Sequence, residues 1–293
     1  MSQAIEAVQA VSAKPAAQQR LSLNTMTTQR LSFDEAVDLA LRFDVPALGL
    51  WRDKVEEAGL AAAARRLRDT GLRASSLCRG GFFTAADPDG VAAAVADNER
   101  AIDEAAALGA PELVVVAGGL PEGDLDLVAA RQRVADRIGD LAPYAAERGV
   151  RLALEPLHPM FVADRAVIST LEQALDLAAD HDPAAVGVVV DTFHVFWDPA
   201  AEAMVERAGR EGRISSYQVC DFNLPIPEGA LLSRVMMGDG HIDFERWTRA
   251  VTRAGYAGDV EVEIFNADIW SRDAAEVLTQ MRERYDALVA PWL

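Results

Sequence analysis

Four oxygen-bearing side chains stand at or near the carboxyl ends of apolar, strand-like stretches in the second half of the chain: Glu155, Asp191, Gln218 and Glu263. Ligands of α/β proteins bind outside the carboxyl ends of parallel strands, so we expect these side chains to meet at one mouth. Three carboxylates brought together without a nearby lysine repel one another unless a cation lies between them. Oxygen ligands favour a hard divalent ion, Mn²⁺ or Mg²⁺, over Zn²⁺. The sequence therefore predicts a metal site made by these four residues.

Two histidines follow two of these carboxylates at the same spacing. His158 stands three residues after Glu155, and His194 stands three residues after Asp191. The ordinary pKa of histidine lies near working pH, and we therefore predict that His158 is the general base. Two roles stay open for His194: contact with the substrate, or a structural role in which the imidazole holds a ligand carboxylate.

Eight short apolar stretches alternate with eight segments of helical periodicity, and this order predicts a single (β/α)₈ TIM barrel. A doubly wound open sheet is the alternative, but no Gly-x-Gly-x-x-Gly motif opens the first helix. The expected strands cover residues 21–25, 45–51, 72–77, 113–117, 150–155, 186–191, 214–221 and 260–265. The expected helices cover residues 33–43, 56–69, 89–108, 125–148, 168–179, 200–208, 244–254 and 272–288.

The barrel is expected to span residues 21–293 as one domain. Residues 1–20 are predicted to be a flexible N-terminal tail that is disordered or forms a short helix. Glu261 shares its side of the last strand with Glu263, so it should point into the barrel one layer deeper. An unpaired buried carboxylate is costly, and Glu261 is therefore predicted to have a partner, with Arg151 or a water as candidates.

The composition argues against several classes of protein. The net charge of −18 over 293 residues disfavours nucleic-acid binding, which needs clustered lysine and arginine. No stretch approaches 18 uninterrupted apolar residues, so no membrane span is predicted. Cys78 and Cys220 give neither a disulfide framework nor a Cys-x-x-Cys metal motif. These features fit a cytoplasmic protein that acts on small molecules.

The spacing of the candidate site resembles that of the xylose isomerase-like TIM-barrel superfamily, above all its sugar isomerase and epimerase branch. The resemblance covers the chain from about residue 21 to its end, and it is carried by Glu155, Asp191-Thr-Phe-His194, Gln218, Gly238-Asp-Gly-His-Ile-Asp243 and Glu263. In that superfamily, a Glu, an Asp, a His and a Glu from strands five to eight bind one divalent metal. The resemblance implies that Glu155, Asp191 and Glu263 are metal ligands and that His194 lies near the substrate. It also implies that a carboxylate or a histidine moves a proton next to the carbonyl of a ketose.

Gln218 departs from the family pattern, because histidine is usual at that position. An amide oxygen still ligates Mn²⁺ or Mg²⁺, although such a site should be weaker for Zn²⁺. Together with Glu155-Pro-Leu-His158, this departure is similar to the large subunit of C-glycoside deglycosidases. Those enzymes use Mn²⁺ and a catalytic histidine to cleave the C–C bond of 3-oxo-C-glucosides, and they pair with a small β-sandwich subunit.

These expectations describe a Mn²⁺- or Mg²⁺-dependent enzyme that acts on an oxo-sugar or sugar conjugate by enolisation, as an isomerase, an epimerase or a C–C lyase. We expect an oligomer, which would include a small β-sandwich subunit if the chain is a deglycosidase. Two other classes stay open: a metal-free barrel that serves as a binding or scaffold subunit, and an AP-endonuclease-like nuclease. The nuclease is disfavoured, because its trinuclear zinc site needs more ligands than the four histidines of this chain allow.

Overall fold

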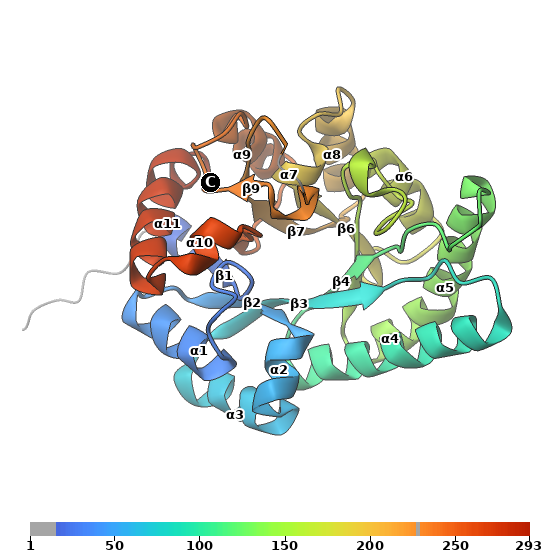
Figure 1. Ribbon diagram of the computed structural model, residues 1–293, viewed down its shortest axis with the longest axis horizontal. Helices are drawn as coiled ribbons and strands as arrows, with labels where there is room; N and C mark the ends of the chain where they lie inside the picture. Colours follow the sequence, from blue (N-terminus) through green and yellow to red (C-terminus); the bar gives the residue numbers. More distant parts are fainter. Residues whose placement is uncertain (1–15, 227–228) are drawn as a thin grey trace, which may run out of the picture.

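The chain folds into a closed barrel of eight parallel strands surrounded by helices (Figure 1). The computed structural model describes residues 16–226 and 229–293, and it confirms the predicted (β/α)₈ architecture. The strands are ordered β1-β10-β7-β6-β5-β4-β3-β2, so neighbours in the ring follow one another along the chain and β10 closes the ring against β1. Residues 1–15, which make up most of the predicted tail, lie outside the described residues. The rest of the tail forms a short 3-10 helix, η1 (Ala16–Arg20).

Most barrel strands begin and end close to their predicted positions: β1 (Leu21–Asn24), β2 (Ala47–Trp51), β3 (Arg73–Gly81), β4 (Glu112–Val116), β5 (Arg151–Glu155), β6 (Val186–Asp191), β7 (Ile214–Val219) and β10 (Val260–Val262). The helices that cover them are α1 (Phe33–Arg42), α2 (Arg52–Ala58), α3 (Leu60–Thr70), α4 (Pro88–Leu108), α5 (Leu127–Glu147), α6 (Leu171–Ala178), α8 (Ala201–Arg210), α9 (Phe244–Arg253) and α11 (Ala274–Leu288). The single helix predicted at 56–69 is wrong. Gly59, at a φ of +81°, separates α2 from α3, because a glycine adopts this backbone conformation without steric cost.

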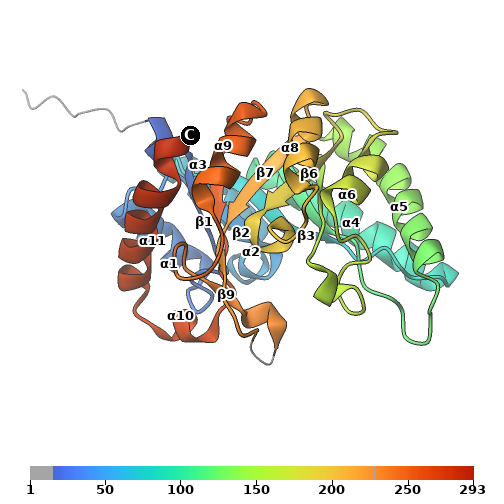
Figure 2. The ribbon, with the colours of Figure 1, turned by 90° about the horizontal axis from the view of Figure 1, so that it is seen from above.

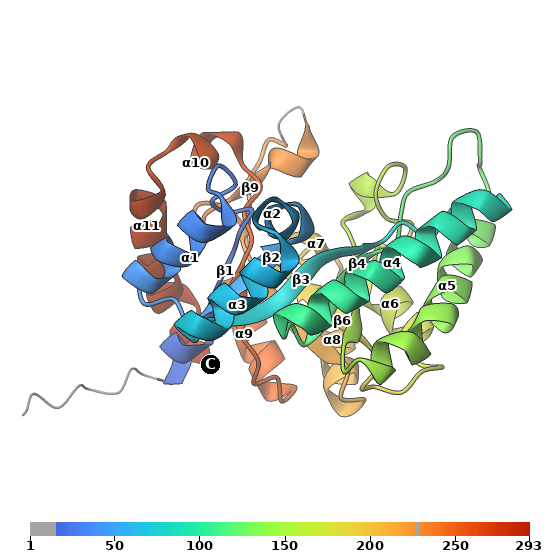
Figure 3. The same ribbon diagram turned by 90° about the horizontal axis from the view of Figure 1, so that it is seen from below.

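Short elements that the sequence did not predict cover the carboxyl ends of the strands. They are η2 (Pro159–Phe161), α7 (Thr192–Val195) and α10 (Ala267–Ser271), which follow β5, β6 and β10. The connection after β7 forms an antiparallel hairpin of β8 (Asp221–Phe222) and β9 (Arg234–Val235), with η3 (Ala230–Leu232) between them. Figures 2 and 3 show β9 and α10 at the end of the barrel opposite the C-terminus of the chain. The hairpin therefore lies at the end where barrel enzymes carry their active sites.

The glycine-rich turn after β9 is held by one buried carboxylate. Asp221 accepts hydrogen bonds from the backbone N–H groups of Gly238, Gly240 and Ile242, at 2.9 to 3.0 Å. A Cβ atom on Gly240 would lie only 2.4 Å from the carbonyl oxygen of Phe222, so only glycine fits this close approach. Asp221 thus ties the turn to the hairpin and helps to fix the position of β9.

The interior of the barrel contains a buried carboxylate below the strand ends. Glu261 accepts hydrogen bonds from Asn24 at 2.6 Å, from the hydroxyls of two serines of β3, and from Gln218 at 3.3 Å. The prediction that Glu261 has a partner is confirmed, but Arg151 is not that partner. Arg151 begins β5, at the amino-terminal end of the barrel, and donates to the backbone carbonyl of Gly212 instead.

A second buried glutamate gives a stability prediction. Burial raises the pKa of Glu112, the first residue of β4, to about 8, and the negative charge of Glu261 adds to this shift. The folded protein therefore keeps a proton that the unfolded chain loses near its ordinary pKa of 4.5, so the free energy of unfolding should fall as pH rises between these values. Glu112→Gln cannot ionise, and it is expected to remove up to roughly 5 kcal/mol of this fall. Urea unfolding of both proteins at about pH 5 and about pH 8 measures the effect. If the free energy of unfolding falls equally with rising pH in wild type and in Glu112→Gln, this prediction is contradicted.

No helix among the described residues is both long enough and apolar enough to cross a membrane.

Candidate active site

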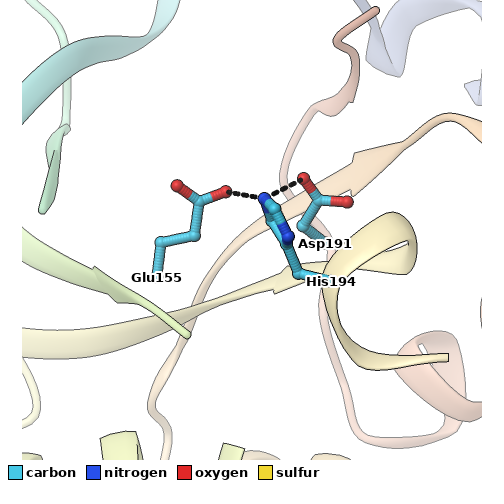
Figure 4. Close-up of side chains that lie close together, drawn as sticks. All are labelled: Glu155, Asp191 and His194. Atoms are coloured by element: carbon cyan, nitrogen blue, oxygen red, sulfur yellow. Dashed lines mark ion pairs between the residues drawn. The ribbon is translucent and has the colours of Figure 1, made fainter. Parts of the chain in front are cut away.

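The structure brings the four predicted ligand side chains to the same end of the barrel. Glu155 ends β5, Asp191 ends β6, Gln218 lies in β7, and Glu263 follows β10 directly. All four are buried, with at most 6% of each residue exposed. In the described part of the chain, Glu155, Asp191 and His194 bring one donor atom each to within 4.8 Å of one another (Figure 4). The strands thus carry all four groups to one end of the barrel, and of the four only Glu155 and Asp191 belong to this cluster. The metal site made by the four residues stays a prediction.

Arg234 is the cation that lies between the carboxylates in this structure and offsets their repulsion. This role of Arg234 was not predicted. The Nη1 atom of Arg234 donates to Asp191 Oδ2 at 3.0 Å and to Glu263 Oε2 at 2.7 Å. The guanidinium comes from β9 and is almost fully buried. No periodic pattern marks this residue in the sequence. The only signal near it is the glycine-rich turn four residues later, which shapes the hairpin that carries Arg234.

One guanidinium does not balance the charge of three buried carboxylates. Burial raises the pKa of Glu155 well above its ordinary value, and the neighbouring charges of Glu263 and Asp191 raise it further. Burial also raises the pKa of Asp191, and it raises that of Glu263 to about 7, although Arg234 opposes both shifts. The site therefore has a strong tendency to take up positive charge, as a proton or as a metal ion.

Two buried acceptor atoms in the site have no hydrogen-bond partner among the described residues, and they provide a test of whether a metal fits. Gln218 donates through Nε2 to Glu261, which leaves its Oε1 atom turned elsewhere and without a donor. Glu155 Oε1 also lacks a hydrogen-bond donor. Buried acceptors are almost always satisfied in proteins, so two such atoms beside a surplus of negative charge fit a bound cation. The donor set, carboxylate and amide oxygens, suits a hard divalent ion.

Both ring nitrogens of His194 have a donor close by. The backbone N–H of His158 lies 3.1 Å from Nδ1, and Arg234 Nη2 lies 2.9 Å from Nε2. A neutral imidazole accepts through one nitrogen only, so the ring accepts one of these two hydrogen bonds at a time. Burial and the charge of Arg234 lower the pKa of His194 well below its ordinary value, which keeps the ring neutral. His194 Nε2 lies 3.9 Å from Glu155 and from Asp191 (Figure 4).

His158, the predicted base, lies beside this cluster with its ring among aromatic side chains. The ring stacks on Phe222 with centroids 5.7 Å apart and meets Trp197 edge-on. Its Nδ1 atom accepts a hydrogen bond from the backbone N–H of Met160, and burial lowers its pKa. The base role of His158 stays a prediction. What the structure adds is a positioning role, because the backbone N–H of His158 contacts Nδ1 of His194.

A small cavity of about 40 Å³, here called the inner cavity, opens onto the cluster. It combines the charged groups of the site with apolar and aromatic walls, and it is lined by Trp51, Cys78, Arg79, Val116, Glu155, Leu157, Arg165, His194, Leu231, Arg234, Glu263 and Phe265. A larger pocket of about 430 Å³, here called the outer pocket, shares Trp51, Cys78 and Arg79 with it and extends over Phe82 and α2. Asp191, Gln218 and His158 do not line the inner cavity.

Comparison with known proteins places this chain in a family. The family model described as xylose isomerase-like TIM barrel matches residues 33–284. This chain belongs to the xylose isomerase-like TIM-barrel family. The family predicted from the spacing of the site residues is thereby confirmed, whereas the likeness to C-glycoside deglycosidases is not.

Two curated members of the family show how far the likeness extends. The inosose isomerase of Bacillus velezensis is 25% identical over 242 residues, which cover 81% of this chain and 83% of that enzyme. The 3-dehydroshikimate dehydratase of Pseudomonas aeruginosa is 31% identical over 137 residues, but these cover 45% of this chain and only 20% of that enzyme.

Two solved structures are also similar. A protein of Sinorhizobium meliloti 1021 is 46% identical, with a TM-score of 0.90 over 92% of this chain and 98% of that one. The IOLI protein, whose structure was solved with a zinc atom, is 21% identical, with a TM-score of 0.81 over 94% of this chain and 99% of that one. The second likeness shows the shared fold alone.

Proposed function

We propose that this chain is a divalent-metal-dependent enzyme that moves a proton next to the carbonyl group of an oxo-sugar or a related polyhydroxylated oxo compound, as an isomerase or epimerase. The observation that carries the proposal is the buried cluster of Glu155, Asp191 and Glu263 below a cavity, with unpartnered acceptor atoms on Glu155 and Gln218. The name inosose isomerase of the Bacillus velezensis relative supports an isomerisation of a cyclic oxo compound.

The residues that would hold the metal are Glu155, Asp191, Gln218 and Glu263. Their oxygen donors favour Mn²⁺ or Mg²⁺, although the IOLI protein was solved with zinc. When bound, such an ion polarises the carbonyl oxygen of the substrate and so acidifies the neighbouring C–H group.

The protein groups that line the inner cavity divide the remaining work. The guanidinium of Arg234 and the imidazole of His194 bind substrate oxygens, since both residues line the inner cavity. Glu263 lines the inner cavity, where its carboxylate can exchange a proton with the substrate. Trp51 and Phe265, in edge-on contact at 5.4 Å, form an apolar wall that suits the face of a sugar ring.

Glu263 and His158 are the two candidates for the general base, and a pair of variants distinguishes them. Glu263 lines the cavity, whereas His158 acts in this structure through the backbone hydrogen bond to His194. At saturating Mn²⁺, Glu263→Gln is expected to slow proton exchange by at least about a hundredfold. His158→Ala should keep its metal and lose about tenfold or less, because the backbone N–H survives the substitution. A loss of a hundredfold or more in His158→Ala, with metal retained, would instead assign the base to His158, as the sequence predicted.

C–C bond cleavage of a 3-oxo-C-glycoside is a second candidate, and the outer pocket favours it. This pocket adjoins the inner cavity and contains Trp51 and Phe82, which suit an aromatic aglycone. In that reaction the enolate formed by proton removal expels the aglycone, whose carbon is then protonated. Co-purification of a small β-sandwich subunit, and an oligomer containing it, would accompany this function.

Incubation of the Mn²⁺-loaded protein in D₂O with an inosose, a simple ketose and a 3-oxo-C-glucoside tests these alternatives. The products are analysed by mass spectrometry. We expect deuterium to be incorporated into the sugar without cleavage of a C–C bond. Release of free aglycone would establish the C–C lyase instead. Metal content at the level of contamination, together with no exchange, would favour the metal-free scaffold and overturn the proposed function.

A further inference from the structure

Arg79 is a cation without an anionic partner at the edge of the inner cavity. The pairing of β3 with β4 runs from Cys78 opposite Val114 to Gly80 opposite Val115, so Arg79 is the extra residue of a β-bulge. Bulges re-aim side chains near binding sites, and here Cys78 and Arg79 both line the inner cavity although they are adjacent in the strand. Within residues 16–226 and 229–293, Arg79 makes no hydrogen bond or ion pair. Its guanidinium lies over the ring of Phe82, 4.0 Å from the ring centre.

A second arginine lies beside it. Arg165, between η2 and α6, also lines the inner cavity, and its buried Nε atom has no hydrogen-bond acceptor. Its carboxylate neighbour is Asp164, 3.7 Å away, mostly exposed and adjacent in sequence. Burial lowers the pKa of Arg79. The positive charge of Arg165 is close enough to lower this pKa further. Two like charges that share a partly buried cavity cost free energy unless an anion lies between them.

Arg52, another arginine at this mouth, shows what a structurally satisfied cation looks like in the same surroundings. Arg52, in the outer pocket, pairs with Asp97 at 3.0 Å and with Glu104 at 2.7 Å. The chain carries a net charge of −18, so carboxylates are abundant, yet Arg79 has none and Arg165 has only an exposed neighbour. Asp97 acts on Arg79 through its charge without forming an ion pair with it. Among the described residues, the two guanidiniums are therefore the cations of the inner cavity that no buried carboxylate pairs with directly.

We propose that the substrate carries a carboxylate or phosphate group and that Arg79 and Arg165 bind this group. The proposal rests on the proposed function, because it places the anionic end of the substrate at the two arginines and its oxo end at Glu155, His194 and Glu263. Planar guanidiniums form paired hydrogen bonds with both kinds of oxyanion. The two arginines also fix the direction in which the substrate enters, since the carboxylates at the base of the cavity repel its charged end.

Three ketoses that differ only at C6 test this proposal: D-fructose, D-fructuronate and D-fructose 6-phosphate. Calorimetry with the Mn²⁺-loaded protein should give at least about tenfold tighter binding for one of the two anions than for D-fructose. Which anion gains separates a carboxylate site from a phosphate site. Arg79→Gln and Arg165→Gln should each lower the ratio of the affinity for that anion to the affinity for D-fructose to about one. Arg100→Gln, at an exposed arginine of α4 that pairs with Asp97, is the control and should keep the preference.

Two results would overturn the proposal: failure of both anions to bind more tightly than D-fructose, and a preference that survives in both Arg79→Gln and Arg165→Gln. Deuterium exchange from D₂O is measured on the same three sugars. It separates failure of the anion-site proposal from failure of the proposed function. Exchange into D-fructose in the wild type, with neither anion bound more tightly than D-fructose, would keep the enzyme and reject the anion site. An arginine-dependent preference without exchange into any sugar would support the anion site and reject the isomerase.

Discussion

Replacing Glu155 with glutamine is expected to abolish metal binding and turnover while it stabilises the metal-free protein. The carboxylate of Glu155 is buried, its Oε1 atom has no hydrogen-bond donor, and Arg234 makes its ion pairs with Asp191 and Glu263 instead. Loss of one of the proposed charged ligands should weaken Mn²⁺ binding at least about a hundredfold, and activity should fall with it. Metal content by mass spectrometry and deuterium exchange measure these two effects.

The stability effect of Glu155→Gln depends on pH in a defined direction. Burial and the charges of Glu263 and Asp191 raise the pKa of Glu155 well above its ordinary value of 4.5. Between that value and the higher pKa of the folded state, the folded protein binds a proton that the unfolded chain has lost, so stability falls as pH rises. The variant lacks this fall, and its free energy of unfolding in the presence of a chelator should exceed that of wild type at neutral pH.

Asp176→Asn is the matched control, because Asp176 is an exposed carboxylate of α6 that pairs with Arg207. It should change neither the metal content nor the pH dependence of stability. A Glu155→Gln protein that binds Mn²⁺ as tightly as wild type would remove Glu155 from the ligand set.

Replacing Arg234 with glutamine should make the stability of the protein depend on metal. Arg234 is the cation paired with Asp191 and Glu263, and removal of one partner from a buried ion pair typically costs about 3–5 kcal/mol. Metal should restore much of this loss, since it neutralises the same carboxylates. It should also bind the variant more tightly, because the guanidinium no longer competes for Asp191 Oδ2 and Glu263 Oε2. Urea unfolding with Mn²⁺ and with a chelator measures both effects.

Arg213→Gln separates this effect from the general cost of losing a buried arginine. Arg213 is buried and donates to the backbone carbonyls of Val186 and His181, away from the acidic cluster. Its loss should destabilise the protein equally with and without Mn²⁺. If Mn²⁺ stabilises Arg234→Gln no more than it stabilises wild type, Arg234 and the metal do not share a site.

The fold and the carboxylates could be predicted because each depends on a local pattern. Alternating apolar strands and amphipathic helices specify the barrel, and the parallel strands carry their last residues to one end. Glu155 and Asp191 therefore meet in space although 36 positions separate them. The break of the second predicted helix at Gly59 was missed, because helical periodicity continues through the glycine while its backbone does not.

The cations of the site could not be predicted, because none of them depends on a periodic pattern. Arg234 reaches the carboxylates only because the chain after β7 folds back as the hairpin of β8 and β9. Arg79 faces the cavity only because β3 contains a bulge, which no residue type announces. Glu261 was predicted to need a partner. Its partners are short polar side chains of β1, β3 and β7, and not the distant Arg151.

The most direct test of the account is a crystal structure of the protein grown with Mn²⁺, with data collected for the anomalous signal of manganese. We expect one anomalous peak bounded by Glu155, Asp191, Gln218 and Glu263, with the guanidinium of Arg234 withdrawn from Asp191 and Glu263. No peak at this position, with Arg234 still paired to both carboxylates at saturating Mn²⁺, would contradict the metal site and the function proposed from it.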